Sequence, residues 1–263
     1  RMRLDALLTE LGLFDSREKA KAAVMSGEVY VNGQKEDKPG SGFPTDAAVE
    51  VRQVAIPFVS RGGLKLSKAL DTFRVDPAGL SVLDCGASTG GFTDCLLKRG
   101  ALRVWAADVG YGQLAWTLRN DPRVINMERF NIRSVTPEIL GGLADMATMD
   151  LSFISLSLVL PVVRQTLVTD ATVICLIKPQ FEAGRGKVGK NGVVRDPAIH
   201  REVLQRFSVS AVNAGYSVKG ITFSPIKGPK GNIEYLAHLT ADGRGEAPVD
   251  LTLAVAAAHE ELS

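Results

Sequence analysis

The chain has 263 residues, of which 45% are hydrophobic and 23% are charged, and its formal net charge is +2. This length fits about two domains, and the composition is that of a soluble globular protein. Because the net charge is so small, any affinity for nucleic acid has to come from local basic patches.

Cysteines, histidines and apolar segments exclude several other classes of protein. The three cysteines and three histidines stand in no spacing typical of a disulfide framework or a zinc site. The amino end, RMRLDALL, shows no secretory or transit signal, and the most apolar window, residues 151–163, is too short to span a membrane. We therefore expect a cytoplasmic protein that has no bound metal and no membrane span.

Residues 1–52 predict a small module of two helices followed by a small β element. Leucines recur on one helical face of the first segment, and glycine ends both helices. An Asn-Gly pair between short β-branched runs is typical of a tight hairpin turn. The helices are expected over residues 3–11 and 17–26, the strands over 29–31 and 48–51, and the turn at Asn32-Gly33.

This order resembles the small RNA-binding S-four (αL) domain of ribosomal small-subunit proteins. The residues that carry the resemblance are Arg3-Leu4-Asp5, Ser16-Arg17, Ala20, Gly27, Val29 and Val31-Asn32-Gly33. Eight Lys or Arg residues stand against nine Asp or Glu residues in the module, so only a local cluster can attract RNA. That cluster is Arg1, Arg3, Arg17, Lys19 and Lys21, and the alternative is a solvated helix face.

A connector separates this module from the rest of the chain. Pro57 resists continuation of either flanking element, so we place a linker at residues 53–59 and a second domain at 60–263. The segment SRGGLKL, residues 60–66, is expected to open a helix that runs to about Phe73. Lys65 lies in its first turn, where a cation opposes the positive end of the helix dipole, and an unfavourable charge of this kind points mildly to function.

From Ser81 onward strands alternate with helices, which predicts a parallel, doubly wound sheet. The last two strands, 218–223 and 233–239, are joined by a loop with no room for a crossover helix, so they should be antiparallel neighbours. A mostly parallel sheet closed by such a hairpin resembles class I S-adenosylmethionine (AdoMet) methyltransferases. The earlier strands are expected near 81–85, 103–109, 123–127, 145–150 and 172–177, and the helices near 91–99, 112–119, 136–141, 155–166 and 197–214.

The stretch SVLDCGASTGGF, residues 81–92, has the order strand, glycine-rich turn, helix, which suits a nucleotide-like cofactor. Asp108 follows Gly86 by 22 positions at the end of the next strand, where a carboxylate can accept both ribose hydroxyls of an adenosine. Asp84 could anchor the loop or reach the methionine ammonium, and Asn131 could contact the adenine. The predicted cofactor site is Asp84, Gly86, Ala87, Ser88, Thr89, Gly90, Gly91, Asp108, Val109 and Asn131.

The segment GRGKVGKN, residues 184–191, has the spacing of a phosphate-binding P-loop. Asn191, however, stands where a Ser or Thr would bind magnesium, and several loop residues separate the motif from the strand that ends at Lys178. We interpret the segment as a flexible basic loop that offers Arg185, Lys187 and Lys190 to an RNA backbone.

Four further polar residues stand at informative places. Lys65 precedes the first strand, Asp150 ends the fourth, Lys178 ends the fifth and Glu234 begins the last. Their order and contexts resemble the Lys-Asp-Lys-Glu tetrad of FtsJ-type ribose 2′-O-methyltransferases, although each alone also fits an ion pair. The resemblance implies that Lys178 is the general base, if burial and the charge of Lys65 disfavour its ammonium. Asp150 would orient Lys178, and Glu234 would hold Lys65.

Motifs over nearly the whole chain resemble the TlyA family, bacterial ribosomal-RNA 2′-O-methyltransferases that modify cytidine and are often labelled haemolysins. These motifs are SRGGLKL, LDCGASTGGFTD, ADVGYGQLAW, MDLSFISL, IKPQFEAG and GPKGNIEY, and the connector RQVAIPFV departs from the family pattern. The resemblance implies AdoMet as cofactor, S-adenosylhomocysteine as product and ribosomal RNA or ribosomal subunits as partner. It assigns Arg3, Arg17, Arg129 and Arg185 to RNA.

Three other functions are weaker. A membrane-active haemolysin requires a spanning segment, a secretion signal or a basic amphipathic helix, and none is evident. A non-catalytic RNA-binding protein requires damage at the tetrad or the cofactor loop, and both look intact. A nicotinamide oxidoreductase fits Asp108 but not the terminal hairpin.

Overall fold

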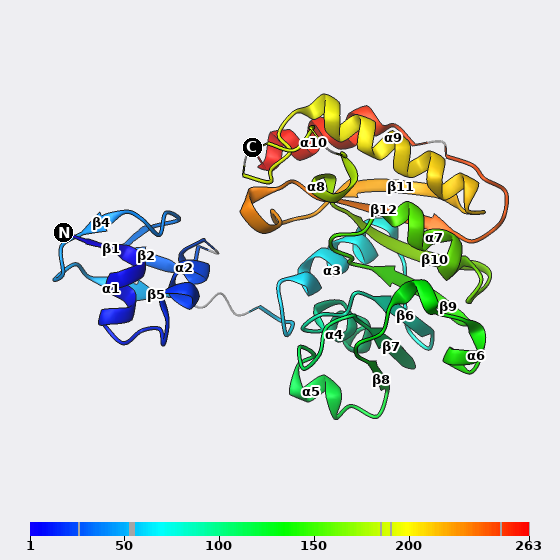
Figure 1. Cartoon of the computed structure of the whole chain (residues 1–263), viewed down its shortest axis with the longest axis horizontal. Coiled ribbons are helices and arrows are strands. Elements are labelled where there is room, and N and C mark those ends of the chain that lie inside the picture. The colour runs from blue at the N-terminus through cyan, green and yellow to red at the C-terminus, as the bar shows by residue number, and fades with distance from the viewer. Residues whose placement is uncertain (26, 53–55, 185, 190, 248, 263) are drawn as a thin grey trace. The chain divides into compact units, whose positions relative to one another are not determined.

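Separate hydrophobic cores divide the chain into two units, Arg1–Ala55 and Ile56–Ser263, in this computed structural model (Figure 1). The structure describes residues 1–25, 27–52, 56–184, 186–189, 191–247 and 249–262. Each unit is described by itself below.

The first unit packs two helices against short strands. Leu4 and Leu8 on the first helix and Val24 on the second are fully buried together, as the apolar spacing of the sequence predicts. Asn32 and Gly33 have φ of 50° and 79°, which is the left-handed pair that a tight hairpin turn needs. Strand β2 pairs antiparallel with β3 and β5, and β1 pairs with β4. The elements are β1 (Met2–Arg3), α1 (Leu4–Glu10), α2 (Arg17–Met25), β2 (Val29–Val31), β3 (Gln34–Lys35), β4 (Gly42–Phe43) and β5 (Val49–Val51).

The second unit contains a seven-stranded sheet with the order β11-β12-β10-β9-β6-β7-β8. Neighbouring strands from β10 to β8 pair in parallel, whereas β12 runs antiparallel to both β10 and β11. The mostly parallel sheet closed by a terminal hairpin is therefore confirmed. The strands are β6 (Ser81–Cys85), β7 (Arg103–Ala107), β8 (Val124–Met127), β9 (Ala144–Met149), β10 (Leu167–Ile177), β11 (Ser217–Phe223) and β12 (Tyr235–Thr240).

Helices cover both faces of this sheet, as Figure 1 shows. Alternate residues of β10 explain why: Val173 and Cys175 enter the core beneath α7, α9 and α10, while Ile174 and Leu176 enter the core beneath α3 and α4. The helices are α3 (Gly62–Phe73), α4 (Gly91–Lys98), α5 (Trp116–Arg119), α6 (Pro137–Leu140), α7 (Leu156–Arg164), α8 (Pro179–Glu182), α9 (Pro197–Asn213) and α10 (Leu251–Leu262), with short 3-10 turns at η1 (Ile132–Ser134) and η2 (Pro229–Gly231).

Some boundaries differ from the sequence prediction. Helix α5 begins at Trp116 and not near residue 112, because Gly112 has φ +70° and Ala115 has ψ 141°, and neither value fits a right-handed helix. Strand β10 begins at Leu167, five residues before the expected start, with an irregularity in its pairing between Leu167 and Thr172. Helices α8 and α10 were not predicted.

The antiparallel direction of β12 determines where the site residues meet. Asp150 follows β9 and Lys178 follows β10, so both lie at the carboxyl edge of the sheet. Ile177 of β10 pairs with Tyr235 of β12. Because β12 runs the opposite way, Glu234, which precedes it, comes to the same edge beside Lys178.

Residues 57–59, which the sequence places in a linker, are part of the second unit and pack against its helices α3 and α4. The backbone N–H of Val59 donates to Asp94 Oδ2 at 2.9 Å, and Lys98 Nζ donates to the carbonyl oxygen of Pro57. The Phe58 ring lies so close to Gly63 of α3 that a Cβ there would collide with it. Residues 53–55 lie outside the described part of the chain.

Candidate active site

The glycine-rich turn after β6 brings two loops into close contact. Gly86 has φ +87°, and a Cβ on it would collide with the main-chain oxygen of Asp150. Gly90, the N-terminal cap of α4, has φ +99° and lies against Leu118. Only glycine suits both positions, so the glycine pattern of the sequence follows from this close approach.

A cavity of about 470 Å³ opens beside this turn. Five of the predicted cofactor residues line it: Gly86, Ser88, Asp108, Val109 and Asn131. The other predicted residues, Asp84, Ala87, Thr89, Gly90 and Gly91, are absent from its described lining. Sequence reasoning missed four more residues of the lining. Gln113 lies within the motif ADVGYGQLAW, whereas Phe130, Ile132 and Arg133 lie outside the motifs named above.

Asp108 ties the turn to the end of β7. Its Oδ2 accepts the backbone N–H of Ser88 at 2.8 Å, and its Oδ1 accepts that of Gly110 at 2.7 Å. Both carboxylate oxygens retain a second lone pair. Asn131 lies across the cavity, where its side-chain oxygen accepts the N–H of Arg133 and caps η1.

Asp84 is fully buried beneath the turn. It accepts hydrogen bonds from the hydroxyls of Thr93 at 2.6 Å and Thr148 at 2.9 Å. Burial raises the pKa of this carboxyl to about 6, although the two threonine hydrogen bonds oppose the shift. These hydrogen bonds tie the end of β6 to α4 and β9, and the two roles considered from sequence stay predictions.

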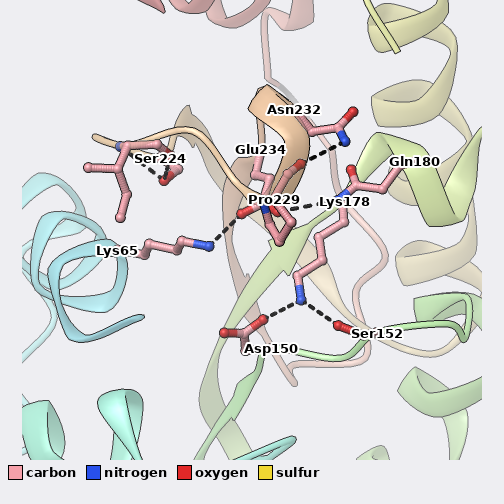
Figure 2. A network of polar contacts seen from close by, with 10 residues as sticks. Lys65, Asp150, Ser152, Lys178, Gln180, Ser224, Pro229, Asn232 and Glu234 are labelled. Carbon is pink, nitrogen blue, oxygen red and sulfur yellow. Dashed lines mark hydrogen bonds and ion pairs between the residues drawn. The ribbon is translucent and has the colours of Figure 1, made fainter. Parts of the chain in front are cut away.

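The four tetrad residues form two ion pairs (Figure 2). Lys65 Nζ lies 2.6 Å from Glu234 Oε2, and Lys178 Nζ lies 2.6 Å from Asp150 Oδ1. Glu234 is 0% exposed and Lys65 is 8% exposed, so the first pair is almost dry. Three strand ends and helix α3, which carries Lys65, thus bring together all four residues that the sequence singled out.

Lys178 reaches the edge of the cavity. Its ammonium donates to Ser152 Oγ at 3.0 Å as well as contacting Asp150, and both of these residues line the cavity. The Asp150 contact is an ion pair, and within the described residues Asp150 Oδ1 accepts no well-formed hydrogen bond. Ser152 was not predicted, although it lies in the motif MDLSFISL.

The aromatic residue next to Ser152 is unusual. Phe153 is 90% exposed and has φ +63°, which is uncommon for a residue with a side chain. Its ring centroid lies 4.8 Å from that of Phe181, three residues after Lys178. An apolar ring is therefore presented to solvent beside the Lys178 and Asp150 pair.

The basic residues predicted in the first unit are only partly clustered. Arg3 and Arg17 both contact Asp5, at 2.8 and 3.2 Å. The hydrogen bond from Arg3 is the main reason that the pKa of Asp5 falls to about 2. Lys19 pairs with Asp15 at 2.8 Å, and Lys21 is exposed.

The basic residues predicted in the second unit differ in their surroundings. The guanidinium of Arg129 lies 4.1 Å from the ring centroid of Tyr111, which is itself 67% exposed. Lys187 is paired with Glu202 of α9. Arg185 and Lys190 lie outside the described residues.

Among the residues that the structure describes, no group of three or more His, Cys, Asp or Glu side chains is arranged to hold a metal ion. No helix of the described ranges has the length and apolar character needed to cross a membrane. The three cysteines are free and buried.

Comparison with known proteins agrees with the fold and identifies the family. The FtsJ-like methyltransferase family matches residues 58–241, and the S4 domain matches residues 2–42. A candidate rRNA methyltransferase, YqxC, of Bacillus subtilis is 51% identical over 95% of this chain and 89% of its own length. The 16S/23S rRNA (cytidine-2′-O)-methyltransferase TlyA of Mycobacterium tuberculosis is 47% identical over 91% of this chain and 90% of its own length.

A solved structure described as a candidate hemolysin from Streptococcus thermophilus aligns with a TM-score of 0.79 and 46% identity, covering 99% of this chain and 96% of that one. Fold and site together define a methyltransferase with a Rossmann-like catalytic domain and an S4 domain. The chain belongs to the TlyA family of FtsJ-like methyltransferases.

Proposed function

We propose that the protein transfers a methyl group from AdoMet to the ribose 2′-hydroxyl of cytidine in ribosomal RNA. The observation that carries the proposal is the pair of Lys178 and Asp150 at the edge of the cavity beside the glycine-rich turn. The (cytidine-2′-O) specificity of the M. tuberculosis relative supports the choice of nucleotide and oxygen.

The residues around the cavity fit AdoMet, which supplies an electrophilic methyl group on a sulfonium when it is bound. We expect the free lone pairs of Asp108 to accept the ribose hydroxyls, because its carboxylate is already fixed by two backbone N–H groups. Gly86 lines the cavity, and its lack of a side chain lets the turn approach the main chain of Asp150. Asn131 and Phe130 line the part of the wall that we assign to the adenine.

We assign the general base to Lys178. A ribose hydroxyl is a poor nucleophile, so its proton has to leave as the oxygen attacks, and a positioned base contributes about 10²- to 10⁴-fold. Asp150 and Ser152 hold the lysine nitrogen from two directions, at 2.6 and 3.0 Å. This geometry supports alignment of the nitrogen with a hydroxyl at the cavity edge.

Lys65 and Glu234 have a different role in this proposal. The carboxylate of Glu234 neutralises Lys65 at 2.6 Å, so we do not assign to Lys65 the electrostatic activation of Lys178 that the sequence suggests. We propose instead that the pair of Lys65 and Glu234 is a rigid structural support next to Lys178 and completes the polar network of the site.

Nucleotide binding is assigned to several surfaces. The exposed ring of Phe153 beside the base suits stacking with an unpaired nucleobase, the usual mode of single-stranded RNA recognition. We propose residues 1–52 as the S4-type RNA-binding domain, 53–59 as the linker and 60–263 as the methyltransferase domain. We propose that Arg3 and Arg17 of the RNA-binding domain and Arg129 of the methyltransferase domain contact RNA phosphates.

Transfer of tritiated methyl groups from AdoMet to ribosomal subunits tests the assignment of Lys178. Lys178→Ala should abolish transfer while AdoMet affinity stays nearly unchanged, because Lys178 is not part of the cavity lining. Lys219→Ala is the matched control, because Lys219 lies on β11 and is also paired with a carboxylate, that of Asp242; this variant should stay active. A fully active Lys178→Ala enzyme would overturn the assignment.

A further inference from the structure

Gln180 is a fifth polar side chain, which joins the network of the four tetrad residues. It lies in α8, two residues after Lys178, and its Nε2 donates to Glu234 Oε1 at 3.3 Å (Figure 2). The other oxygen of the same carboxylate, Oε2, receives the ammonium of Lys65 at 2.6 Å. The two oxygens of Glu234 are thus held by two different donors on two different elements.

The orientation of the Gln180 amide is dictated by Glu234. Its Oε1 is buried and accepts no hydrogen bond from any described residue, which is costly for an amide. The opposite orientation would turn that oxygen toward the Glu234 carboxylate and replace an attraction by a repulsion. The side chain therefore leaves one acceptor unpaired and keeps its donor on Glu234.

The backbone closes the third side of this carboxylate. Gly228 precedes η2, and a Cβ on it would collide with Glu234 Oε1. Lys65, Gln180 and the Gly228 backbone leave Glu234 with no exposed surface. The carboxylate therefore has little room to move as long as both donors remain.

We propose that Gln180 is a positioning residue for methyl transfer. Its amide ties the segment that carries Lys178 to Glu234, and so keeps the buried Lys65 and Glu234 pair in register with the base. The inference rests on the proposed function, because the step that it positions is proton removal by Lys178.

Two substitutions separate this role from a general effect on folding. Gln180→Met keeps the length of the side chain and removes the donor, so kcat should fall about 10- to 100-fold while AdoMet affinity stays within about twofold. Gln180→Glu can donate to Glu234 only when the two carboxyls share a proton. Its kcat relative to wild type should therefore rise several-fold as the pH falls from about 8.5 to about 6.

The controls are Gln165→Met and Gln165→Glu at an exposed position after α7, and both should leave kcat unchanged at every pH. Wild-type kcat in Gln180→Met, or a flat pH ratio in Gln180→Glu, would overturn the positioning role and leave the proposed function standing. Failure of the wild-type enzyme to methylate a ribose hydroxyl would overturn the proposed function, and this inference with it.

Discussion

Single residues of the site are organised as charge pairs. Each lysine has one carboxylate at 2.6 Å, and the buried pair of Lys65 and Glu234 has almost no contact with water. Removing one member of a buried pair leaves an uncompensated charge, whereas replacing both by apolar groups often costs little. Stability and activity should therefore respond differently to single and double substitutions here.

Glu234→Ala should lower the free energy of unfolding by about 3–5 kcal/mol, because it leaves the Lys65 ammonium buried without a partner. The double variant Lys65→Met with Glu234→Leu should recover most of that loss and remain inactive. Urea unfolding followed by tryptophan fluorescence measures this, since both tryptophans, Trp105 and Trp116, lie in the second unit. A double variant no more stable than Glu234→Ala would contradict the pairing argument.

The buried carboxyl of Asp84 determines whether the free energy of unfolding rises or falls with pH. Its folded pKa of about 6 lies above the ordinary value of 3.8, so the folded state holds this proton more tightly than the unfolded state. Its contribution to stability is complete below about pH 4 and is lost as the pH rises through about 6, on the order of 2–3 kcal/mol.

Asp84→Asn should remove that decline, because an amide has no proton to lose in this range. Its free energy of unfolding relative to wild type should increase between about pH 4 and about pH 7, measured by the same fluorescence assay. Asp145→Asn, near the start of β9, is the control, because this carboxyl is only half-buried and accepts the backbone N–H of Ser81. A difference between wild type and Asp84→Asn that does not vary with pH would refute the burial argument.

Among the elements, the connection between β11 and β12 fixes the position of Glu234. It delivers Glu234 to the sheet edge, and Gly228 within it lies against the Glu234 carboxylate. The φ of Gly228 is −73°, so an alanine there is allowed by the backbone and disfavoured only by this contact.

Gly228→Ala should therefore displace the Glu234 carboxylate and lower kcat by about tenfold or more, with AdoMet affinity retained. Gly42→Ala is the matched control, because a Cβ there meets only ordinary contact with Arg1. Steady-state methylation of ribosomal subunits measures both. Wild-type kcat in Gly228→Ala would show that the close approach has no catalytic consequence.

The elements that carry strong periodicity were predictable. The strands alternate with helices, and a loop too short for a crossover predicted the antiparallel pair β11 and β12, which is confirmed. Helix α8 has only four residues and begins with a proline, so it leaves no apolar stripe to recognise. Helix α10 lies behind the sheet and was also missed, although Ala254, Val255 and Ala258 are buried there.

The site was predictable where chemistry coincides with a strand end. Lys178 and Asp150 directly follow apolar strands, so a charged residue at each of these positions is conspicuous in the sequence. Gln180 and Ser152 do not, because a glutamine and a serine in a turn fit many surfaces, and only their distances to Glu234 and Lys178 distinguish them. The burial of Asp84 could not be predicted from the sequence either, since it depends on how Thr93 and Thr148 pack around its carboxylate.

At the scale of the whole molecule, the two units divide the work in our proposal. A fragment of residues 56–263 should bind AdoMet like the full chain and lose affinity for ribosomal RNA. The fragment has to begin before Pro57, because residues 57–59 contact α3 and α4. Filter binding of labelled RNA and AdoMet measures both affinities, and equal rates of methylation with and without residues 1–52 would refute the RNA role of the first unit.

The most direct test of the central claim is the identity of the methylated nucleoside. Ribosomal RNA is incubated with the protein and methyl-labelled AdoMet, digested to nucleosides and separated by chromatography. We predict label in 2′-O-methylcytidine with the wild-type protein and none with Lys178→Ala. Label in a base-methylated nucleoside, or undiminished label in 2′-O-methylcytidine with Lys178→Ala, would contradict the account.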